Sequence, residues 1–386
     1  MKFLYVVSLN SISDFALALI EMGHTVALVP DINPDPNAPD ESHRTIIKSA
    51  IEKEKPDYVA SYLFIPMVSD ITHSYGIPYI SWTYDSPLTS LFSPELENDN
   101  NYTFVFDKQE YLRLKARSSS KLYHLPMAAY LSRIGAIDLK DYEISKYSSD
   151  ISFIGTLYQE NAYNSYIGYL DELTQLELKH YLLTHIRNYS EVKSWPKLSD
   201  HAVNNICNTL GSHSWNKTTL SDNEFLGLLF LTRKLAEMDR VTLLNALAEK
   251  HSVDLYTGDT SNPALVNVKC HGRVDYNTEM SKIFYCSKIN LNITLPSIET
   301  GIPQRVFDIM ACGGFCMTNY QKEVNDLFTE GENIETFRTT EELLEKTDYY
   351  LRHENERIRI AINGYKLIKE KHTLQHRIQD MLKLVQ

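Results

Sequence analysis

The sequence predicts an α/β protein built from two doubly wound domains, each a parallel sheet with helices on both faces. The chain has 386 residues, which exceeds the usual size of a single hydrophobic core. Its 43% hydrophobic and 23% charged residues are typical of a globular protein. Short strand-like runs alternate with helical patterns along both halves of the chain, and this alternation is typical of parallel sheets.

The first domain is expected over residues 1–130. A strand-like run at 3–8, an amphipathic segment around Phe15 that stops at Gly23, and a second run at 25–30 predict a βαβ opening. Further strand-like runs lie at 58–64, 79–83, 103–106 and 122–127. Residues 131–149 have no clear periodicity, and we interpret them as the linker between the domains.

The second domain is expected over residues 150–370. After a first strand at 150–156, a long helical pattern predicts an inserted helical subdomain over about 160–250. Strand-like runs then resume at 253–258, 268–274, 289–294, 315–320 and 334–338. A closing helix at about 370–386 is a candidate to pack back on the first domain.

Composition and motifs exclude several classes of function. The net charge of −12 argues against a nucleic-acid partner, because binding of a phosphate backbone needs clustered Lys and Arg. No apolar stretch approaches the roughly 20 residues of a membrane span. Five cysteines without paired spacing and the lack of a signal-peptide pattern favour a cytoplasmic protein. Neither a dinucleotide-binding glycine motif nor a P-loop occurs, and no metal-binding motif is found, so no metal is expected.

The richest turn follows the run at 289–294. Gly301 precedes a predicted helix with Pro303 in its first turn, and the free amides at such a helix start suit a diphosphate. Arg305 and Asp308 share one face of that helix. A guanidinium neutralises phosphate, and a carboxylate accepts hydrogen bonds from ribose hydroxyls. An ordinary exposed ion pair on a surface helix explains the same spacing, so spacing alone does not decide.

Other strand ends supply further candidates, because ligands of doubly wound sheets bind beyond the carboxyl ends of strands. Gly155 and Thr156 follow the strand at 150–156, where small residues let backbone amides approach phosphates; a simple tight turn is the alternative. Asp85 is the candidate general base of the first domain, and a turn cap before Pro87 is its alternative. Ser8 and Asn10 are candidates to line the acceptor side.

A series of motifs in fixed order resembles one family. From Ile289 to about Arg377 the sequence carries INLNIT, GIPQRVFDIMACGGF, NDLFTEGENI, ELLEKTDYYL, IAINGY and HTLQHR. The resemblance extends back through HGRVDY, DISFIGTLY, HLPMA and SWTYDSP. In this pattern the chain resembles the CgeB-like, spore-maturation type glycosyltransferases. The resemblance implies a GT-B fold, in which two Rossmann-like domains face each other across a cleft and the C-terminal one holds the nucleotide sugar.

The resemblance also implies roles for individual residues. It assigns the base to the Val274 backbone and the Tyr276 ring, the ribose to Asp308, and the sugar hydroxyls to Glu299. The related transferases carry two acidic residues eight positions apart, whereas Glu299 and Asp308 are nine apart and the second is Asp instead of Glu. The expected nucleotide-sugar ligands are Gly155, Thr156, Val274, Tyr276, Thr294, Gly301, Ile302, Pro303, Arg305 and Asp308. The expected catalytic residues are Asp85, Glu299 and Arg305.

The sequence thus leads to the hypothesis of a glycosyltransferase. It is expected to move a hexose from a nucleoside diphosphate sugar, with uridine as the base, to a hydroxyl of a glycan or protein, without metal or additional cofactor. One alternative is a nucleotide-sugar epimerase of the same architecture. Another is a non-catalytic nucleotide-binding scaffold that uses the helical insertion as a docking surface.

Overall fold

The computed structural model describes residues 1–7, 13–29, 41–134, 137–186, 189, 195–211, 218–258 and 260–385. Ser8 and Asn10 lie outside these described residues. The chain forms two compact units. Unit 1 comprises Met1–Tyr130, Ser214–Ser221 and His372–Gln386, and unit 2 comprises Leu131–His213 and Asp222–Lys371. The expected linker, residues 131–149, is thus part of unit 2, and the closing helix is part of unit 1.

Unit 1 contains a parallel six-stranded sheet in the order β2-β1-β3-β4-β5-β6. Strand β1 lies between β2 and β3, with Phe3 opposite Val26 on one side and Tyr58 on the other. The strands are β1 (Lys2–Val6), β2 (Thr25–Val29), β3 (Tyr58–Tyr62), β4 (Tyr79–Trp82), β5 (Asn101–Val105) and β6 (Leu122–His124). Most of their residues are buried, as expected for a sheet covered on both faces.

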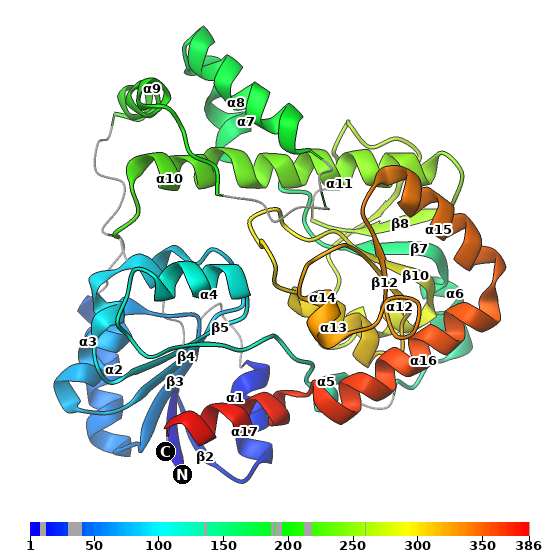
Figure 1. Cartoon of the computed structure of the whole chain (residues 1–386). Coiled ribbons are helices and arrows are strands. Elements are labelled where there is room, and N and C mark those ends of the chain that lie inside the picture. The colour runs from blue at the N-terminus through cyan, green and yellow to red at the C-terminus, as the bar shows by residue number, and fades with distance from the viewer. Residues whose placement is uncertain are drawn as a thin grey trace. The chain divides into compact units, whose positions relative to one another are not determined.

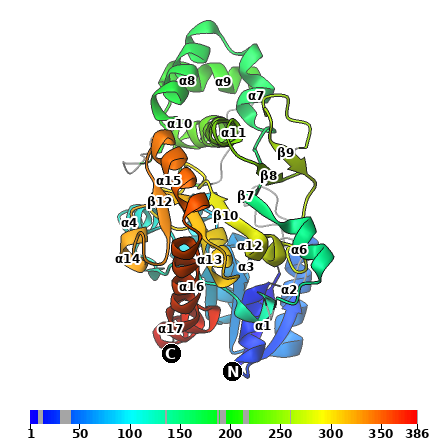
Figure 2. The same ribbon diagram turned by 90° about the vertical axis from the view of Figure 1, so that its right-hand side faces the viewer.

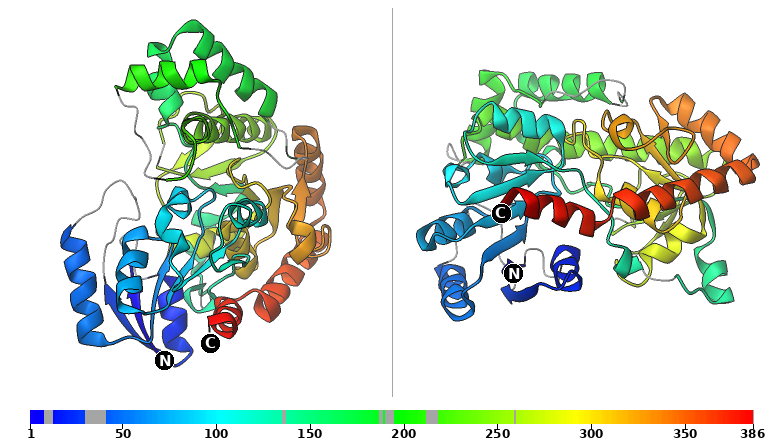
Figure 3. Two further views of the ribbon diagram at one scale, coloured as in Figure 1. Left: turned by 60° about the vertical axis from the view of Figure 1, so that its left-hand side comes forward. Right: turned by 60° about the horizontal axis from the view of Figure 1, so that its bottom comes forward.

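The helices of unit 1 cover its sheet from both sides. Helix α1 packs on α17 and helix α2 packs on α3, and the left view of Figure 3 shows blue α2 and red α17 on opposite sides of the blue strands. Ser13 caps α1, because its Oγ accepts a hydrogen bond from the Ala16 amide at 3.2 Å. These helices are α1 (Asp14–Glu21), α2 (Glu41–Glu54), α3 (Pro66–Tyr75), α4 (Lys108–Lys115) and α17 (Leu374–Val385).

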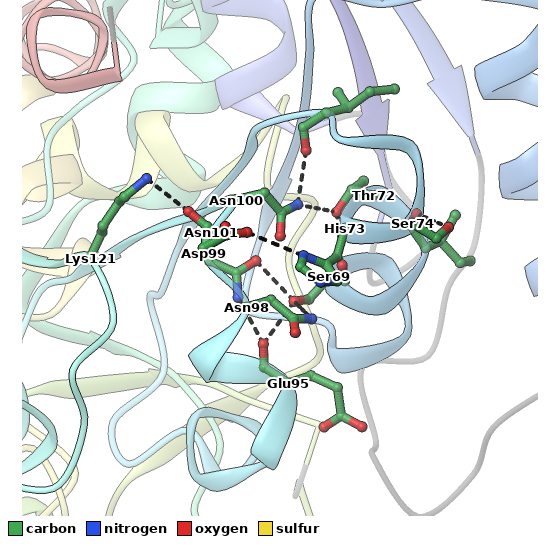
Figure 4. Close-up of polar contacts among 12 residues, drawn as sticks. Ser69, Thr72, His73, Ser74, Glu95, Asn98, Asp99, Asn100, Asn101 and Lys121 are labelled. Carbon is green, nitrogen blue, oxygen red and sulfur yellow. Dashed lines mark hydrogen bonds and ion pairs between the residues drawn. The ribbon is translucent and has the colours of Figure 1, made fainter.

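A polar cluster in unit 1 lies at the amino end of β5, between two short 3-10 turns, η1 (Thr89–Phe92) and η2 (Pro94–Glu97), and helix α3 (Figure 4). Ser69 Oγ donates to Asn101 Oδ1 at 2.9 Å, and Asn100 Nδ2 donates to Thr72 Oγ1 at 3.0 Å. Because ligands of parallel sheets bind at the opposite, carboxyl ends, this cluster has a structural role in fixing the start of β5.

Unit 2 contains a second parallel six-stranded sheet, in the order β12-β11-β10-β7-β8-β9. In chain order this is the 3-2-1-4-5-6 arrangement of dinucleotide-type sheets, with the connections diverging between β7 and β10. The strands are β7 (Ser149–Ile154), β8 (Val253–Tyr256), β9 (Lys269–His271), β10 (Ser287–Asn292), β11 (Cys316–Asn319) and β12 (Glu335–Phe337).

Two layers of helices cover the sheet of unit 2, as Figure 2 shows. Helices α11 (Arg233–Ala248) and α15 (Thr340–Arg352) contact each other on one face, where Leu243, Leu244 and Leu247 join Phe153 in the core. The other face carries α12 (Met280–Cys286), α13 (Gln304–Ala311) and α16 (Glu354–Lys371). Shorter helices of this unit are α5 (Leu131–Ile134), α6 (Asp141–Tyr147) and α14 (Val324–Leu327).

The helical insertion lies between β7 and α11 and packs on the outer side of α11 in Figure 2. It contains α7 (Ala162–Tyr166), a 3-10 turn η3 (Ile167–Tyr169), α8 (Glu172–His185), α9 (Asp200–Leu210) and α10 (Asp222–Gly227). A π-helical turn, η4 (Leu228–Thr232), joins α10 to α11, as Figure 1 shows by the unbroken green ribbon. A Cβ at Gly227 would lie 2.4 Å from the carbonyl oxygen of Pro196, so the crossing of the two segments requires glycine.

The predicted fold class is confirmed. Each of the strand-like runs named above overlaps with one strand of the two sheets, and the flanking helices alternate with them as expected. Among the residues that the structure describes, no helix is both long and apolar enough to cross a bilayer.

Candidate functional site

The candidate site lies at the carboxyl ends of β7 and β10 in unit 2. These adjacent strands are paired in parallel, and Ile151 is opposite Ile289. The chain leaves them toward opposite sides of the sheet, and ligands of doubly wound folds bind beyond the carboxyl ends of such a strand pair. The segments that follow the two strands begin at Gly155 and at Ile293.

Arg240 of α11 connects the two segments. Its Nη1 donates to the carbonyl oxygen of Thr156, and its Nη2 donates to that of Ile293 at 2.8 Å. The side chain is buried, and its guanidinium lies 4.8 Å from the centroid of the Tyr158 ring. Burial, together with the nearby Arg305, lowers the pKa of Arg240 to about 10. One buried cation therefore connects the loops that follow β7 and β10.

Arg305 of α13 brings a second guanidinium to the same place. Its Nη1 donates to Asn292 Oδ1 at 3.0 Å, and its guanidinium lies 5.6 Å from the centroid of Phe153. A Cβ at Gly155 would lie 3.0 Å from Arg305 Nη2, so the glycine leaves room for this guanidinium. Burial lowers the pKa of Arg305 as well. Among the described residues, neither Arg240 nor Arg305 has a carboxylate as an ion-pair partner.

The backbone after β7 is strained at one position. Tyr158 has a φ of 58°, in the left-handed region that side chains other than glycine seldom adopt. Its amide donates to Thr156 Oγ1 at 3.1 Å, which holds the turn. Strain of this kind persists where the surrounding structure enforces it, and it clusters at binding sites.

Helix α13 starts directly after the loop that follows β10. Pro303, predicted in the first turn, is its N-cap residue and makes no side-chain cap. The loop before it is anchored to the segment after β11, since Thr300 Oγ1 donates to Glu323 Oε1 at 2.8 Å and Gln321 Nε2 donates to the Ile298 carbonyl at 3.0 Å. The N–H groups and the positive dipole end of a helix start suit an anion, which is why this position is a candidate for the diphosphate.

Thr294 and Ile302, two of the predicted ligands, are buried in this loop. The Thr294 amide donates to Asn319 Oδ1 at 2.7 Å, and its Oγ1 accepts from Asn292 Nδ2 at 3.0 Å. Gly301 is buried as well, and Pro303 is half-buried. These residues shape the loop before α13. The Arg305 side chain extends from the start of that helix to Gly155 at the end of β7.

Glu299 lines a small cavity under the helical insertion. Tyr181, Trp195 and Pro196 come from the insertion, Thr232 and Leu235 from the π-helical turn and α11, and Pro296, Ser297 and Glu299 from the loop after β10. The Glu299 carboxyl is buried. Burial of the Tyr181 hydroxyl, together with the nearby charge of Glu299, raises the pKa of Tyr181 to about 12. Residues of the insertion therefore form one wall of the cavity that contains Glu299, the residue predicted to bind the sugar.

Asp308, the predicted ribose ligand, is buried and already has a cationic neighbour. Arg133 Nη2 donates to Asp308 Oδ1 at 2.8 Å, and Gln304 Nε2 donates to the same oxygen at 3.1 Å. The guanidinium of Arg133 also lies 3.9 Å from the centroid of the Tyr276 ring. Tyr276 is 41% exposed, and Val274 packs on the small cluster of Tyr147, Tyr256 and Ile283. The structure thus brings the predicted ribose and base ligands together around one arginine.

Asp85 lies in unit 1, in the loop after β4, and its side chain is exposed. The next residue, Ser86, donates through Oγ to Asp107 Oδ2 at 3.2 Å, so the loop is tied to the cap of α4. Asp85 therefore follows a strand at its carboxyl end, as predicted, and its role as a general base stays a prediction.

Two residues of this site, Arg240 and Arg133, were not among the sequence-predicted candidates. Arg240 could have been found, because it lies on the buried, mainly apolar face of α11 with Ala236, Leu243 and Leu247. An arginine at a core-facing position is seldom retained without a partner for its charge. For Arg133 no local signal exists, because its partner Asp308 is 175 residues away.

Comparisons with known proteins bear on the whole chain and on this site. Residues 234–383 match the protein family described as "Glycosyl transferase-like", a segment that includes Arg240, Arg305 and Asp308. No curated protein matches the sequence. Similar solved structures include sucrose-phosphate synthase from Thermosynechococcus elongatus, with a TM-score of 0.58 and 11% identity over 99% of this chain and 98% of that chain.

Two further solved structures are similar over their whole length. Anabaena Alr3699/HepE in complex with UDP-glucose has a TM-score of 0.55 and 10% identity, over 100% of this chain and 99% of that chain. A putative UDP-N-acetylglucosamine 2-epimerase from Listeria monocytogenes has a TM-score of 0.51 and 10% identity, over 100% and 95%. At these identities the likeness shows the fold, which is GT-B, and the fold is shared by transferases and an epimerase.

Proposed function

We propose that this protein is a glycosyltransferase that transfers a hexose from a uridine diphosphate sugar to a hydroxyl of a glycan or protein. The observation that carries the proposal is the pair of guanidiniums, Arg240 and Arg305, at the carboxyl ends of β7 and β10. Neither has a carboxylate partner among the described residues. The charges of Asp239 and Asp308 act on Arg240 and Arg305, respectively, but neither carboxylate forms an ion pair with its arginine in the described part of the chain. A bound diphosphate would supply a counter-charge in direct contact, which offsets the cost of keeping the cations away from water.

The phosphate half of the donor would be held by three features of unit 2. Arg305 is half-buried beside Gly155 and can turn a charge-assisted hydrogen bond toward a phosphate oxygen. Arg240 keeps the two loops in register through the carbonyls of Thr156 and Ile293. The uncapped start of α13 adds backbone amides and the positive end of the helix dipole.

The same groups would act in the transfer step. As the bond between the sugar carbon and the diphosphate oxygen breaks, negative charge develops on the departing nucleotide. Fixed cations and amides aimed at that charge stabilise the transition state more than the ground state. We propose that this arrangement makes the transfer independent of metal, so the rate in EDTA should equal the rate in Mg²⁺.

The remaining ligands are proposed by position. Tyr276 and Asp308 would hold the base and the ribose, and Glu299 would contact the sugar from beside the wall made by the insertion. Asp85 in the loop after β4 is proposed as the general base for the acceptor hydroxyl. The CgeB-like subtype and the cytoplasmic location belong to the same proposal, supported by the motif order and by cysteine usage.

The test is a titration of the purified protein with UDP by calorimetry. Wild type should bind, and Arg305→Ala should bind about 10- to 100-fold more weakly, which is the range for a lost hydrogen bond between charged groups. Arg359→Ala is the matched control, because that arginine of unit 2 is exposed and pairs with Glu356 on the surface of α16. Equal affinities for wild type and Arg305→Ala would refute the site.

A turnover assay distinguishes the reaction types. With a UDP-hexose donor and a mixed glycan acceptor pool, the proposal expects UDP release that depends on acceptor. Isomerised donor sugar formed without any acceptor would identify an epimerase instead. Binding of UDP with no turnover of any donor, and unchanged biological activity of Arg305→Ala, would identify a non-catalytic scaffold.

A further inference from the structure

The residues proposed to bind the base and the ribose of the donor already contact a side chain of the protein itself. Arg133, from the four-residue helix α5, donates to Asp308 Oδ1 at 2.8 Å and lies over the Tyr276 ring at 3.9 Å. Its side chain is 5% exposed and that of Asp308 is 2% exposed, so the pair is shielded from water. The contacts are not a surface ion pair of the kind that contributes little.

A planar group stacked on an aromatic ring, with hydrogen-bond donors directed at a carboxylate, has the features that a nucleoside would present there. A base stacks on a tyrosine ring, and two ribose hydroxyls donate to a carboxylate. The guanidinium of Arg133 satisfies both residues in the same way, because it is planar and carries several N–H donors. Arg133 and a nucleoside would therefore compete for Tyr276 and Asp308.

From this we propose that Arg133 sets the affinity for the donor nucleotide by occupying the nucleoside half of the donor site, and that it leaves when the nucleotide binds. This inference rests on the proposed function. The ribose hydroxyls would donate to Asp308 in place of the Arg133 guanidinium, so the buried carboxylate keeps its hydrogen-bond donors during the exchange. The apparent dissociation constant is raised by the fraction of molecules in which Arg133 is in place.

The local structure suits such an exchange. The side chain of Arg133 is buried, but residues 131–133 have partly or fully exposed backbone or side chains, and only Ile134 of α5 is buried as a whole residue. The exchange moves a four-residue helix instead of a core helix, and the buried ion pair that it breaks is replaced by the contacts of the nucleoside. The phosphate half has no such occupant, because Arg240 and Arg305 contact only neutral oxygens and aromatic rings among the described residues.

The experiment compares two ligands on two proteins. Calorimetry would measure UDP and inorganic pyrophosphate on wild type and on Arg133→Ala. The inference expects UDP to bind Arg133→Ala at least about 10-fold more tightly, because the competitor is gone. Pyrophosphate, which reaches only the phosphate half, should bind both proteins equally. Arg133→Lys is the conservative control: it keeps the charge but not the flat stacking group, and its UDP affinity should lie between the two.

Each other outcome refutes a defined claim. If UDP binds Arg133→Ala equally well or more weakly than wild type, Arg133 is a structural residue or a donor ligand, and the inference fails while the proposed function stands. If neither protein binds UDP at all, the proposed function fails together with the inference.

A measurement on wild type covers the case in which Arg133→Ala does not fold. Hydrogen exchange of residues 131–134 should become faster when UDP is added, because Arg133 loses its partners. Slower exchange on UDP addition would overturn the inference.

Discussion

Gly155 offers a sharp test of the phosphate half of the site. The change Gly155→Ala adds a single methyl group, which would lie 3.0 Å from Arg305 Nη2 and 3.3 Å from Phe153 Cζ. Non-bonded carbon contacts are most favourable at about 3.5–4 Å, so one of these neighbours must retreat by a few tenths of an ångström. Phe153 is packed in the core, whereas Arg305 is the end of a flexible side chain, so the guanidinium should move.

The magnitude follows from the contacts that Arg305 would lose. Its Nη1 donates to Asn292 Oδ1 at 3.0 Å, and a shift of the guanidinium by a few tenths of an ångström weakens this hydrogen bond or breaks it. A lost hydrogen bond from a charged group costs about 1.5–3 kcal/mol, and replacing glycine by alanine returns about 0.4–1 kcal/mol through the unfolded state. The net loss of stability is thus about 1–2 kcal/mol, but misplacement of the phosphate ligand should weaken UDP binding about 10- to 100-fold.

Two measurements on the same preparation separate these effects. Thermal unfolding should show a fall in Tm of only a few degrees, and calorimetry should show the larger loss of UDP affinity. Gly168→Ala is the matched control, because a Cβ there has no neighbour within 4 Å. If Gly155→Ala is folded and binds UDP within twofold of wild type, the assignment of Arg305 as the phosphate ligand is wrong.

The remaining predictions concern stability in each unit. Burial, with the nearby Asp107 charge, raises the pKa of Glu110 to about 8, so the folded state holds this proton more tightly than the unfolded state. The contribution of Glu110 to stability is therefore fully present below about pH 4.5 and is lost as the pH rises to about 8. The free energy of unfolding in urea should be equal for Glu110→Gln and wild type at pH 4.5, and higher for the variant by up to roughly 5 kcal/mol at pH 8. A Cβ at Gly364 of α16 would lie 2.6 Å from the Asn333 carbonyl oxygen, so Gly364→Ala should lower the free energy of unfolding by about 1–3 kcal/mol in the same assay. An unchanged pH profile, or an unchanged midpoint, would contradict the respective prediction.

The sheets could be predicted from the sequence because buried parallel strands are continuous apolar runs. Residues 3–6 show this pattern and lie in a buried strand, whereas 253–256 and 287–292 mix apolar with polar residues and are strands as well. Arg305 could be predicted for a related reason, since it lies in the first turn of α13, the helix that follows β10 after the loop of residues 293–303. Local order along the chain thus predicted those parts of the site that lie between a strand and the first turn of the next helix.

The other parts depend on contacts between distant segments. Arg240 belongs to α11, the helix that connects β7 to β8, but the helical insertion lies between β7 and this helix in the sequence. Arg133 lies in a segment expected to be a linker, and its contact with Asp308 joins residues 175 positions apart. Neither contact is signalled by a hydrophobic period or a local motif, because each joins residues that are close only in the folded unit.

The two halves of the proposed donor site satisfy their charges in opposite ways. The phosphate half has two guanidiniums that form no ion pair among the described residues, whereas the nucleoside half has a carboxylate that is already ion-paired with Arg133. A donor is therefore drawn in mainly by its diphosphate, and its nucleoside gains little net free energy because it replaces one set of contacts by another. After transfer, return of Arg133 to Asp308 would offset the contacts that the departing nucleotide loses. On this reasoning Arg133 lowers nucleotide affinity but speeds product release, so Arg133→Ala should bind UDP tightly and turn over slowly once release limits the rate.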